Sequence, residues 1–558
     1  MSSTDGSSSV FDEPMNSNSL NSSILSFGCD NNTSTHIHKN AEFLTIEPLP
    51  PAIQALLKSN QAPLHTHMLQ SNLRDAQITL SNLNVFLDST STELDPDLTA
   101  KRDQLTMMIQ SYRNILHPIR RTPPEVLLEV FSYCIPFVDT MHTLKCRKID
   151  SLNTSLAPWT FGQVCKHWRS IVLECPRLWS SLSVNVDWLL SANRSMGWQQ
   201  AECRAIYLLS NYLRRSKDCP LTIAVHSFRP LSPIIPVIYS HSGRWSNILL
   251  SLHAEDFSLL SMIKGHLPRL KNLHLESSGG WGRDCIVPVI DAFEYAPNLS
   301  SIQTHQIPGI ATKLLLPWGQ ITHCLYSFLT GVTVRERESI NENNIRVLSQ
   351  AVNLRHASLS FLGYPRTLSI TPLTHHTLSA LKMTTINSSN IELITQLLDA
   401  LTLPSLGTLD IDASSIQGIG YGVHSVVRLV ERSSCRLIRL RLSNFETDVD
   451  KDPHFRLLLA LVPNMESLSL DRFPTSLLNA LMVTKDDLKP SLLPRLWHLC
   501  VSGPLLSDKK QELFVDVVES RVQCTDLNVL SMSSHLDLTD AAQTRLESLD
   551  IRLHTFGP

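Results

Sequence analysis

Leu406-Gly-Thr-Leu-Asp-Ile411 is the phrase that decides the fold, because it recurs along the second half of the chain. Its alternating apolar residues are typical of a half-buried strand. From Leu406 onward, successive copies lie about 28–31 residues apart, and weaker copies begin near Leu299, Leu354 and Leu378. A fixed period of this size indicates a stacked array of similar units. The other strong copies are Leu270–Leu275, Leu437–Leu442, Met465–Leu470, Leu496–Val501 and Leu527–Met532.

Amphipathic segments separate these phrases and predict one helix after each strand. A single strand–helix unit cannot cover its own apolar face, so stacking of neighbours must bury a continuous core. We therefore expect an α/β solenoid with parallel strands over residues 241–558, preceded by a connecting or capping segment at 183–240. The predicted helices are Ile391–Leu401, Val423–Val430, Phe455–Val462, Leu477–Val483 and Leu513–Val522.

A second informative stretch is Pro118-Ile-Arg-Arg-Thr-Pro-Pro-Glu-Val-Leu-Leu-Glu-Val-Phe131. Its paired prolines and the glutamate that follows them predict a helix start. Val126, Leu127, Val130 and Phe131 then share one helical stripe, and Val164, Cys165 and Trp168 repeat that spacing. An element of about sixty residues has little room for a self-sufficient core. Part of this apolar surface is therefore expected to meet a partner.

This stretch, with Phe161-Gly-Gln-Val-Cys-Lys-His-Trp-Arg169 and Cys175-Pro-Arg-Leu-Trp179, resembles an F-box over residues 118–182. The resemblance implies a three-helix domain that docks to a Skp-type adaptor and, through it, to a cullin in an SCF-type ubiquitin ligase. The implied adaptor-binding residues are Pro123, Val126, Leu127, Val130, Phe131, Val164, Cys165, Trp168, Leu178 and Trp179.

The strand phrases resemble the leucine-rich repeats that accompany many F-boxes, and the combination is similar to F-box proteins of mushroom-forming fungi. The chain departs from the family in three respects. Thr122 stands where a leucine usually precedes the proline, and the middle connection from Phe137 to Pro158 is long. The Asn or Cys that usually follows each strand is replaced by Ser414, Phe445, Phe473, Pro504 and His535.

The N-terminal part divides in two. Residues 1–60 are rich in Ser and Asn and predict a disordered tail. Residues 61–117 carry apolar side chains at helical spacing on both sides of a turn-rich break near Asp88–Pro96, which favours a helical hairpin over a short intermolecular coiled coil. The predicted fold class is therefore α plus α/β: a helical hairpin and three-helix F-box, then the repeat solenoid.

Residues between the inward-facing leucines of each strand form the candidate substrate-binding face of the solenoid. Alignment of the copies places Asp410 opposite Arg441, so a cross-strand ion pair is expected. The alternative is a solvated face without a binding role. The candidate residues are Asp410, Asp412, Arg439, Arg441, Ser469, Asp471 and His498.

Bulk composition narrows the function classes. The formal net charge of -3 disfavours binding to nucleic acid or anionic membranes. The sequence lacks a secretory leader pattern and any apolar run of membrane-spanning length, and its 12 cysteines are scattered, so we expect an intracellular protein in the cytoplasm or nucleus.

We find no catalytic or metal-ligand motif, and Cys165 with His167, two apart on a predicted helix, make a poor dyad. The sequence thus predicts a non-enzymatic adaptor without a cofactor, which recruits an unknown protein substrate to an SCF-type ligase. The alternative is a scaffold or interaction protein without ubiquitin transfer.

Overall fold

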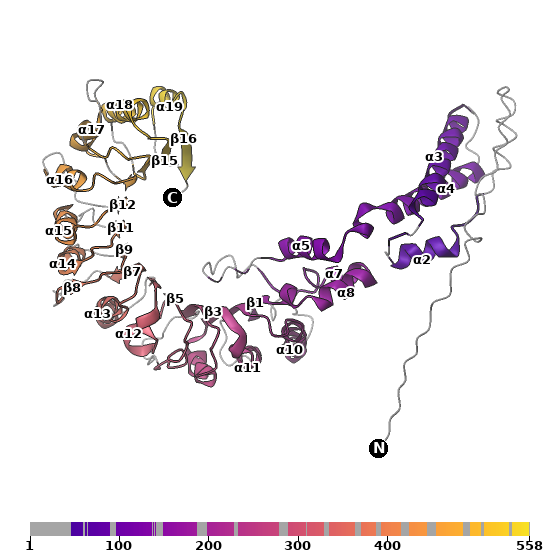
Figure 1. Ribbon diagram of the computed structural model, residues 1–558, viewed down its shortest axis with the longest axis horizontal. Coiled ribbons are helices and arrows are strands. Elements are labelled where there is room, and N and C mark those ends of the chain that lie inside the picture. The colour runs from indigo at the N-terminus through magenta and orange to yellow at the C-terminus, as the bar shows by residue number, and fades with distance from the viewer. Residues whose placement is uncertain are drawn as a thin grey trace, which may run out of the picture. The chain divides into compact units, whose positions relative to one another are not determined.

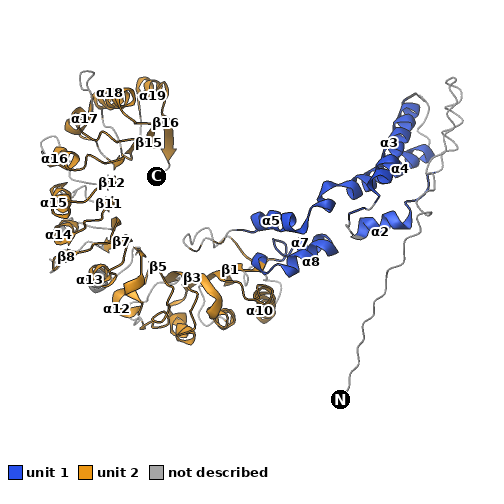
Figure 2. Ribbon diagram, in the orientation of Figure 1, with its two compact units in different colours: residues 1–136, 154–178 blue, residues 137–153, 179–558 orange. Residues whose placement is uncertain are grey.

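The computed structural model describes residues 46–556 except for short gaps, and it separates into two compact units (Figure 2). Unit 1 comprises residues 1–136 and 154–178, and unit 2 comprises residues 137–153 and 179–558. The gaps are 60–61, 64, 90–95, 137, 139, 141–148, 187–197, 228–232, 278–287, 308–309, 328–333, 363–369, 387–391, 414–422, 444–452, 472, 484–491, 504–506 and 535–537.

Three helices begin unit 1: α2 (Pro51–Ser59), α3 (Thr66–Ser89) and α4 (Pro96–Leu116). Leu83 clusters with Leu98 and Leu105 near the turn, and Leu69 clusters with Tyr112 at the other end, so α3 and α4 form an antiparallel hairpin. Helix α2 differs from the expected disorder of residues 1–60. Its isolated apolar residues, Ile53 above all, find cover in the hairpin, while residues 1–45 lie outside the described part of the chain.

The rest of unit 1 is a small helical cluster built around one aromatic ring. It consists of η2 (Pro118–Arg121), α5 (Pro124–Cys134), α7 (Phe161–Val164) and α8 (Lys166–Glu174), and the chain leaves it through η3 (Pro176–Trp179). Phe131 of α5 stacks on Phe161, with ring centroids 4.4 Å apart, and meets the edge of Trp168 at 4.8 Å. Such aromatic pairs supply a dense core to a short domain.

The predicted stripe through Val164, Cys165 and Trp168 is not on one helix, which corrects the sequence interpretation. Cys165 is extended, with φ −160° and ψ 171°, and separates α7 from α8. Its Sγ accepts a hydrogen bond from the Trp168 backbone N–H at 3.4 Å, so the thiol caps α8. The sequence analysis judged Cys165 and His167 a poor dyad because they stand two apart on one helix. That reason does not hold, because the helix does not include Cys165.

Unit 2 is dominated by one 14-stranded parallel sheet whose strands follow chain order, with β8 and β10 pairing separately (Figure 1). Parallel neighbours require crossover connections, and helical segments supply most of those that the structure describes. The strands are β1 (Ser181–Asn185), β2 (Leu221–His226), β3 (Trp245–Leu252), β4 (Asn272–Ser277), β5 (Ser301–His305), β6 (His323–Ser327), β7 (His356–Leu362), β8 (Leu373–Thr374), β9 (Ala380–Ile386), β10 (Leu401–Thr402), β11 (Thr408–Ala413), β12 (Arg439–Ser443), β13 (Ser467–Leu470), β14 (His498–Val501), β15 (Val529–Ser533) and β16 (Arg552–Phe556).

The helices of unit 2 lie along one side of this sheet (Figure 1). Because β1 and β2 belong to the sheet, the array begins at Ser181, and the expected connecting segment 183–240 is part of it. The helices are α10 (Trp198–Arg215), α11 (Ile234–Tyr239), η4 (Ser242–Arg244), η5 (Ala254–Ile263), α12 (Ile310–Lys313), η6 (Trp318–Gln320), α13 (Val334–Gln350), α14 (Glu392–Ala400), α15 (Val423–Ser433), α16 (Pro453–Leu461), α17 (Thr475–Leu481), α18 (Asp508–Cys524) and α19 (Asp540–Glu547).

Arginine side chains join neighbouring strand–helix units on this side of the sheet. Arg432 donates to the backbone carbonyls of Leu398 and Leu401, and the fully buried Arg521 donates to three backbone carbonyls. Such bonds satisfy carbonyl groups that would otherwise be buried without donors. Of the five positions that depart from the family's Asn or Cys, only Phe473 is described; its buried ring packs against Phe514 at 5.9 Å. The other four, Ser414, Phe445, Pro504 and His535, lie outside the described residues.

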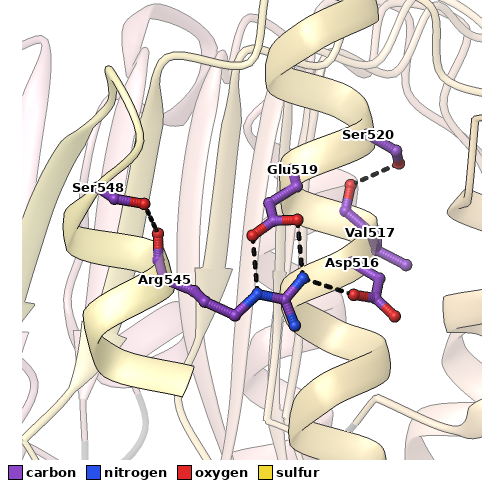
Figure 3. Close-up of polar contacts among 6 residues, drawn as sticks. All are labelled: Asp516, Val517, Glu519, Ser520, Arg545 and Ser548. Carbon is purple, nitrogen blue, oxygen red and sulfur yellow. Dashed lines mark hydrogen bonds and ion pairs between the residues drawn. The ribbon is translucent and has the colours of Figure 1, made fainter. Parts of the chain in front are cut away.

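Ion pairs complete these connections between helices. Arg428 of α15 makes a two-pronged pair with Asp399 of α14 at 2.6 and 2.8 Å. Near the C-terminal end, Arg545 of α19 donates hydrogen bonds to the two carboxylate oxygens of Glu519 and to Asp516 (Figure 3). Glu519 and Asp516 lie on α18. These contacts raise the pKa of Arg545. The last helix is therefore fixed to its neighbour by charge as well as by apolar packing.

Candidate functional site

Helix α5 presents two apolar faces. Leu127 and Phe131 point into unit 1 and are 2% and 1% exposed, whereas Val126 and Val130 are each 50% exposed. Tyr133, which the sequence analysis did not select, is 83% exposed. Val126, Val130 and Tyr133 stand at i, i+4 and i+7, so they lie on one side of the helix. We call these three residues the α5 surface.

The ten residues expected to bind an adaptor therefore fall into different environments. Pro123 and Val164 are exposed, while Cys165 and Trp168 are partly buried. Leu127, Phe131, Leu178 and Trp179 are buried within the chain, which corrects their assignment as partner-facing residues. The missed Tyr133 could have been found from its i+7 spacing to Val126.

Trp179 illustrates why a motif alone misassigned its members. Its ring meets the edge of Tyr212 from α10 at 5.1 Å, and the Arg215 guanidinium lies 4.5 Å from the ring centroid. Both neighbours are more than thirty positions away in sequence. No local pattern around Cys175–Trp179 can reveal that a later helix covers this indole, because burial depends on tertiary contacts.

The side of the sheet opposite the helices carries the second candidate surface. Within β11, Leu409 and Ile411 are buried, and Asp410 and Asp412, which alternate with them, point the other way. Register carries this alternation across the sheet, because directly paired residues on parallel neighbours share a face. We call the face that bears Asp410 and Asp412 the helix-free face.

The N-terminal part of the helix-free face is covered by the chain itself. Val138 packs in one cluster with Ala224 and Leu249, which belong to the same register row as Asp410. His274 Nδ1 donates to the Thr140 carbonyl at 2.7 Å. Ser151 also exchanges hydrogen bonds with Ser183 of β1. The described residues Val138, Thr140 and Ser151 of the long middle connection thus contact strands β1–β4.

Asp410 occupies a cationic setting farther along the same face. The expected pairing of Asp410 with Arg441 is present in the strand register, with Arg441 Nε 3.9 Å from Asp410 Oδ1. Lys382 on β9, which the sequence analysis missed, places Nζ 3.7 Å from Oδ2. Burial raises the pKa of Asp410, and Lys382 and Arg441 oppose that shift. Register with β9 was the signal that identifies Lys382, since Lys382 pairs directly with Asp410.

The remaining candidates spread over β11 to β14. Arg439 is exposed, while Asp412, Ser469, Asp471 and His498 are partly buried. The Nδ1 of His498 lies 2.9 Å from Ser467 Oγ, and its Nε2 lies 3.0 Å from Ser531 Oγ. Burial lowers the pKa of His498, and the positive charge of Arg439 and His554 lowers it further. These groups offer hydrogen bonds and charge to a bound segment.

The described residues do not gather three or more His, Cys, Asp or Glu side chains where a metal ion could bind. None of the helices that the structure describes is both long and apolar enough to cross a membrane. No protein-family model matches the chain, and a search of curated proteins finds no match. Function must therefore be argued from the two surfaces.

Proposed function

We propose that this protein is a substrate-recruiting subunit of an SCF-type ubiquitin ligase. In this proposal, residues 118–182 act as an F-box that docks to a Skp-type adaptor and, through it, to a cullin. The parallel strand–helix array acts as a leucine-rich-repeat solenoid that holds a protein target. The observation that carries the proposal is the exposed α5 surface, which lies within the motif that resembles an F-box.

The α5 surface supports docking because water-exposed valines and a tyrosine on one side of a short helix gain free energy when a partner covers them. Complete burial of such a side chain is worth about 1.5–3 kcal/mol. Leu127 and Phe131 have a different part in the proposal: they hold α5 on the aromatic core, so that Val126 and Val130 keep their outward position.

The target is proposed to bind the helix-free face beyond the portion that Val138 and Thr140 contact. Repeat arrays use extended faces of this kind for binding. The protein contributes proximity to the ligation reaction, because a tethered target presents its lysines at high effective concentration. The chemical step belongs to partner proteins.

Co-purification tests the docking step. Val126→Glu combined with Val130→Glu should abolish recovery of the Skp-type adaptor and the cullin, because each change places a charge in an apolar contact. Val85→Glu is the matched control: Val85 is 67% exposed on α3, and this change should leave recovery intact. All three valines are surface positions, so circular dichroism should show an unchanged fold for both variants.

Two outcomes would contradict the proposal. The wild-type protein could fail to co-purify with any Skp-type adaptor, or the double variant could bind as well as Val85→Glu. In the first case the scaffold alternative would be favoured, because the α5 surface would serve a partner unrelated to ubiquitin transfer.

A further inference from the structure

The last five strands of the sheet concentrate positive charge on the helix-free face. Arg439 and Arg441 stand on β12, His498 on β14, and Arg552 and His554 on β16. Within the bounds of β12–β16, which are all described, this face bears no carboxylate; along the chain, Glu466 directly precedes β13 and Asp471 directly follows it. We call these five residues the cationic row. Arg552 and His554 were not among the residues that the sequence analysis selected.

Register fixes the spacing of the cationic row. Arg439 pairs with Ser467, Ser467 with His498, His498 with Val529 and Val529 with Arg552. At about 4.8 Å per strand, the arginines of β12 and the arginine of β16 therefore lie about 19 Å apart. His498, midway between them, is neutral at pH 7 because its pKa is lowered. The side chains between the charged residues include four short ones, which project little from the sheet: Ser467, Ser469, Cys500 and Ser531.

The ends of the cationic row are accessible. Arg439, Arg441, Arg552 and His554 are all exposed, and His498 is partly buried between two serine hydroxyls. Arg441 is partly neutralised by Asp410 at 3.9 Å, whereas Arg439 has Thr408 and Ser467 as its directly paired neighbours. Arg439 and Arg552 are therefore the strongest free ends of the row for an anionic ligand.

We infer that the cationic row binds an extended peptide segment that carries two Asp or Glu residues about six positions apart. An extended chain advances about 3.3 Å per residue, and residues an even number apart share one side, so six residues match the roughly 19 Å between the arginines of β12 and β16. The positive groups stand at the two ends of the row, which suits separate carboxylates. The inference rests on the proposed function, since it names the class of segment that the recruiting face takes.

Charge complementarity selects this occupant. Screening limits exposed charges to a range of about 10 Å at moderate ionic strength, so each carboxylate senses mainly its own cation. A peptide with the same acidic residues gathered in one run would leave most of the row unmatched. Spacing, and not only total charge, should decide affinity.

The test uses the full chain and a fluorescein-labelled peptide of about ten residues with two Glu six positions apart, followed by fluorescence anisotropy. Comparison peptides carry the same residues with the Glu contiguous, Lys in place of Glu, or phosphoserine in place of Glu. Arg439→Glu combined with Arg552→Glu should weaken binding of the spaced-Glu peptide at least about tenfold. Arg456→Glu, an exposed position on helix α16, is the matched control and should bind normally.

The expected pattern is binding of the spaced-Glu peptide that weakens with added salt, with weaker binding of the contiguous-Glu peptide and none of the Lys peptide. Absence of spaced-Glu binding at about 1 mM, binding of the phosphoserine peptide alone, or an equal loss with Arg456→Glu would overturn the inference. The double variant should still co-purify with the Skp-type adaptor. If the wild-type protein binds the peptide but does not co-purify with a Skp-type adaptor, the proposed function is rejected and the peptide inference stands.

Discussion

Asp150 is a buried carboxyl group in the segment that lies on the sheet. Its Oδ1 accepts the Leu152 backbone N–H at 3.0 Å, and burial raises its pKa to about 6, despite the opposing effect of that hydrogen bond. Because the pKa of Asp150 is higher in the folded state, its protonated carboxyl group favours folding. This stabilisation is complete below the unfolded-state pKa near 4 and is lost as pH rises through about 6.

Asp150→Asn should therefore stabilise this region at pH 7 by about 1–3 kcal/mol, because the amide keeps the acceptor without a buried charge. Amide hydrogen exchange at β1, where Ser183 bonds to Ser151, measures the effect. Exchange in wild-type protein should accelerate between pH 4 and pH 7 beyond the intrinsic rate change, and the variant should lack this excess. An identical excess in both proteins would assign the effect to another group.

Arg521 is the second informative residue, with 1% of its surface exposed. Its guanidinium donates to the carbonyls of Leu481, Leu492 and Leu493 at 2.8, 2.8 and 3.1 Å, and burial lowers its pKa to about 10. Arg521→Met keeps much of the side-chain volume but leaves three carbonyls without this donor. We expect a loss of about 3–5 kcal/mol in denaturant unfolding, and a loss below about 1 kcal/mol would show that water replaces the donor.

At the scale of one element, helix α5 shows which structural features its own sequence predicts and which it does not. The helix start and its apolar stripe are local properties of Pro123–Phe131, so spacing alone indicates them. The split of that stripe into a buried and an exposed half is not local. Phe161 and Trp168, thirty or more positions later, cover Phe131 and leave Val126 and Val130 open.

Truncation at the two faces of α5 should therefore have unequal effects. Phe131→Ala should cost about 3–5 kcal/mol of folding free energy, because it opens a cavity between two aromatic rings. Val126→Ala should change stability by less than about 1 kcal/mol, since half of this side chain is exposed. Denaturant melts followed by circular dichroism compare them, and equal losses would place Val126 in the core.

At the scale of the whole molecule, the main feature is the sheet of unit 2. Each strand of this sheet pairs only with its immediate neighbours. Local damage in such an array spreads mainly to adjacent units. The clamp of Arg545 on Glu519 and Asp516 fastens the final helix to this array (Figure 3).

Arg545→Ala should weaken the C-terminal end by about 1 kcal/mol, a value typical of partly exposed ion pairs. Hydrogen exchange should accelerate in β15 and β16 but not in β2 and β3. Arg456→Ala on α16 is a control expected to change neither region. Uniform acceleration along the sheet would indicate that unit 2 opens as one cooperative body.

The sequence by itself determined the repeated strands and the helices between them, because alternation and helical spacing are local and recur with one period. It also placed Asp410 opposite Arg441, since aligned copies preserve register. Only the tertiary structure decided that Trp179 lies beneath α10, that residues near Val138 and Thr140 cover the first strands, and that Lys382 joins Asp410. These contacts join segments far apart in the chain, and the free energy of covering a surface depends on which distant segment reaches it.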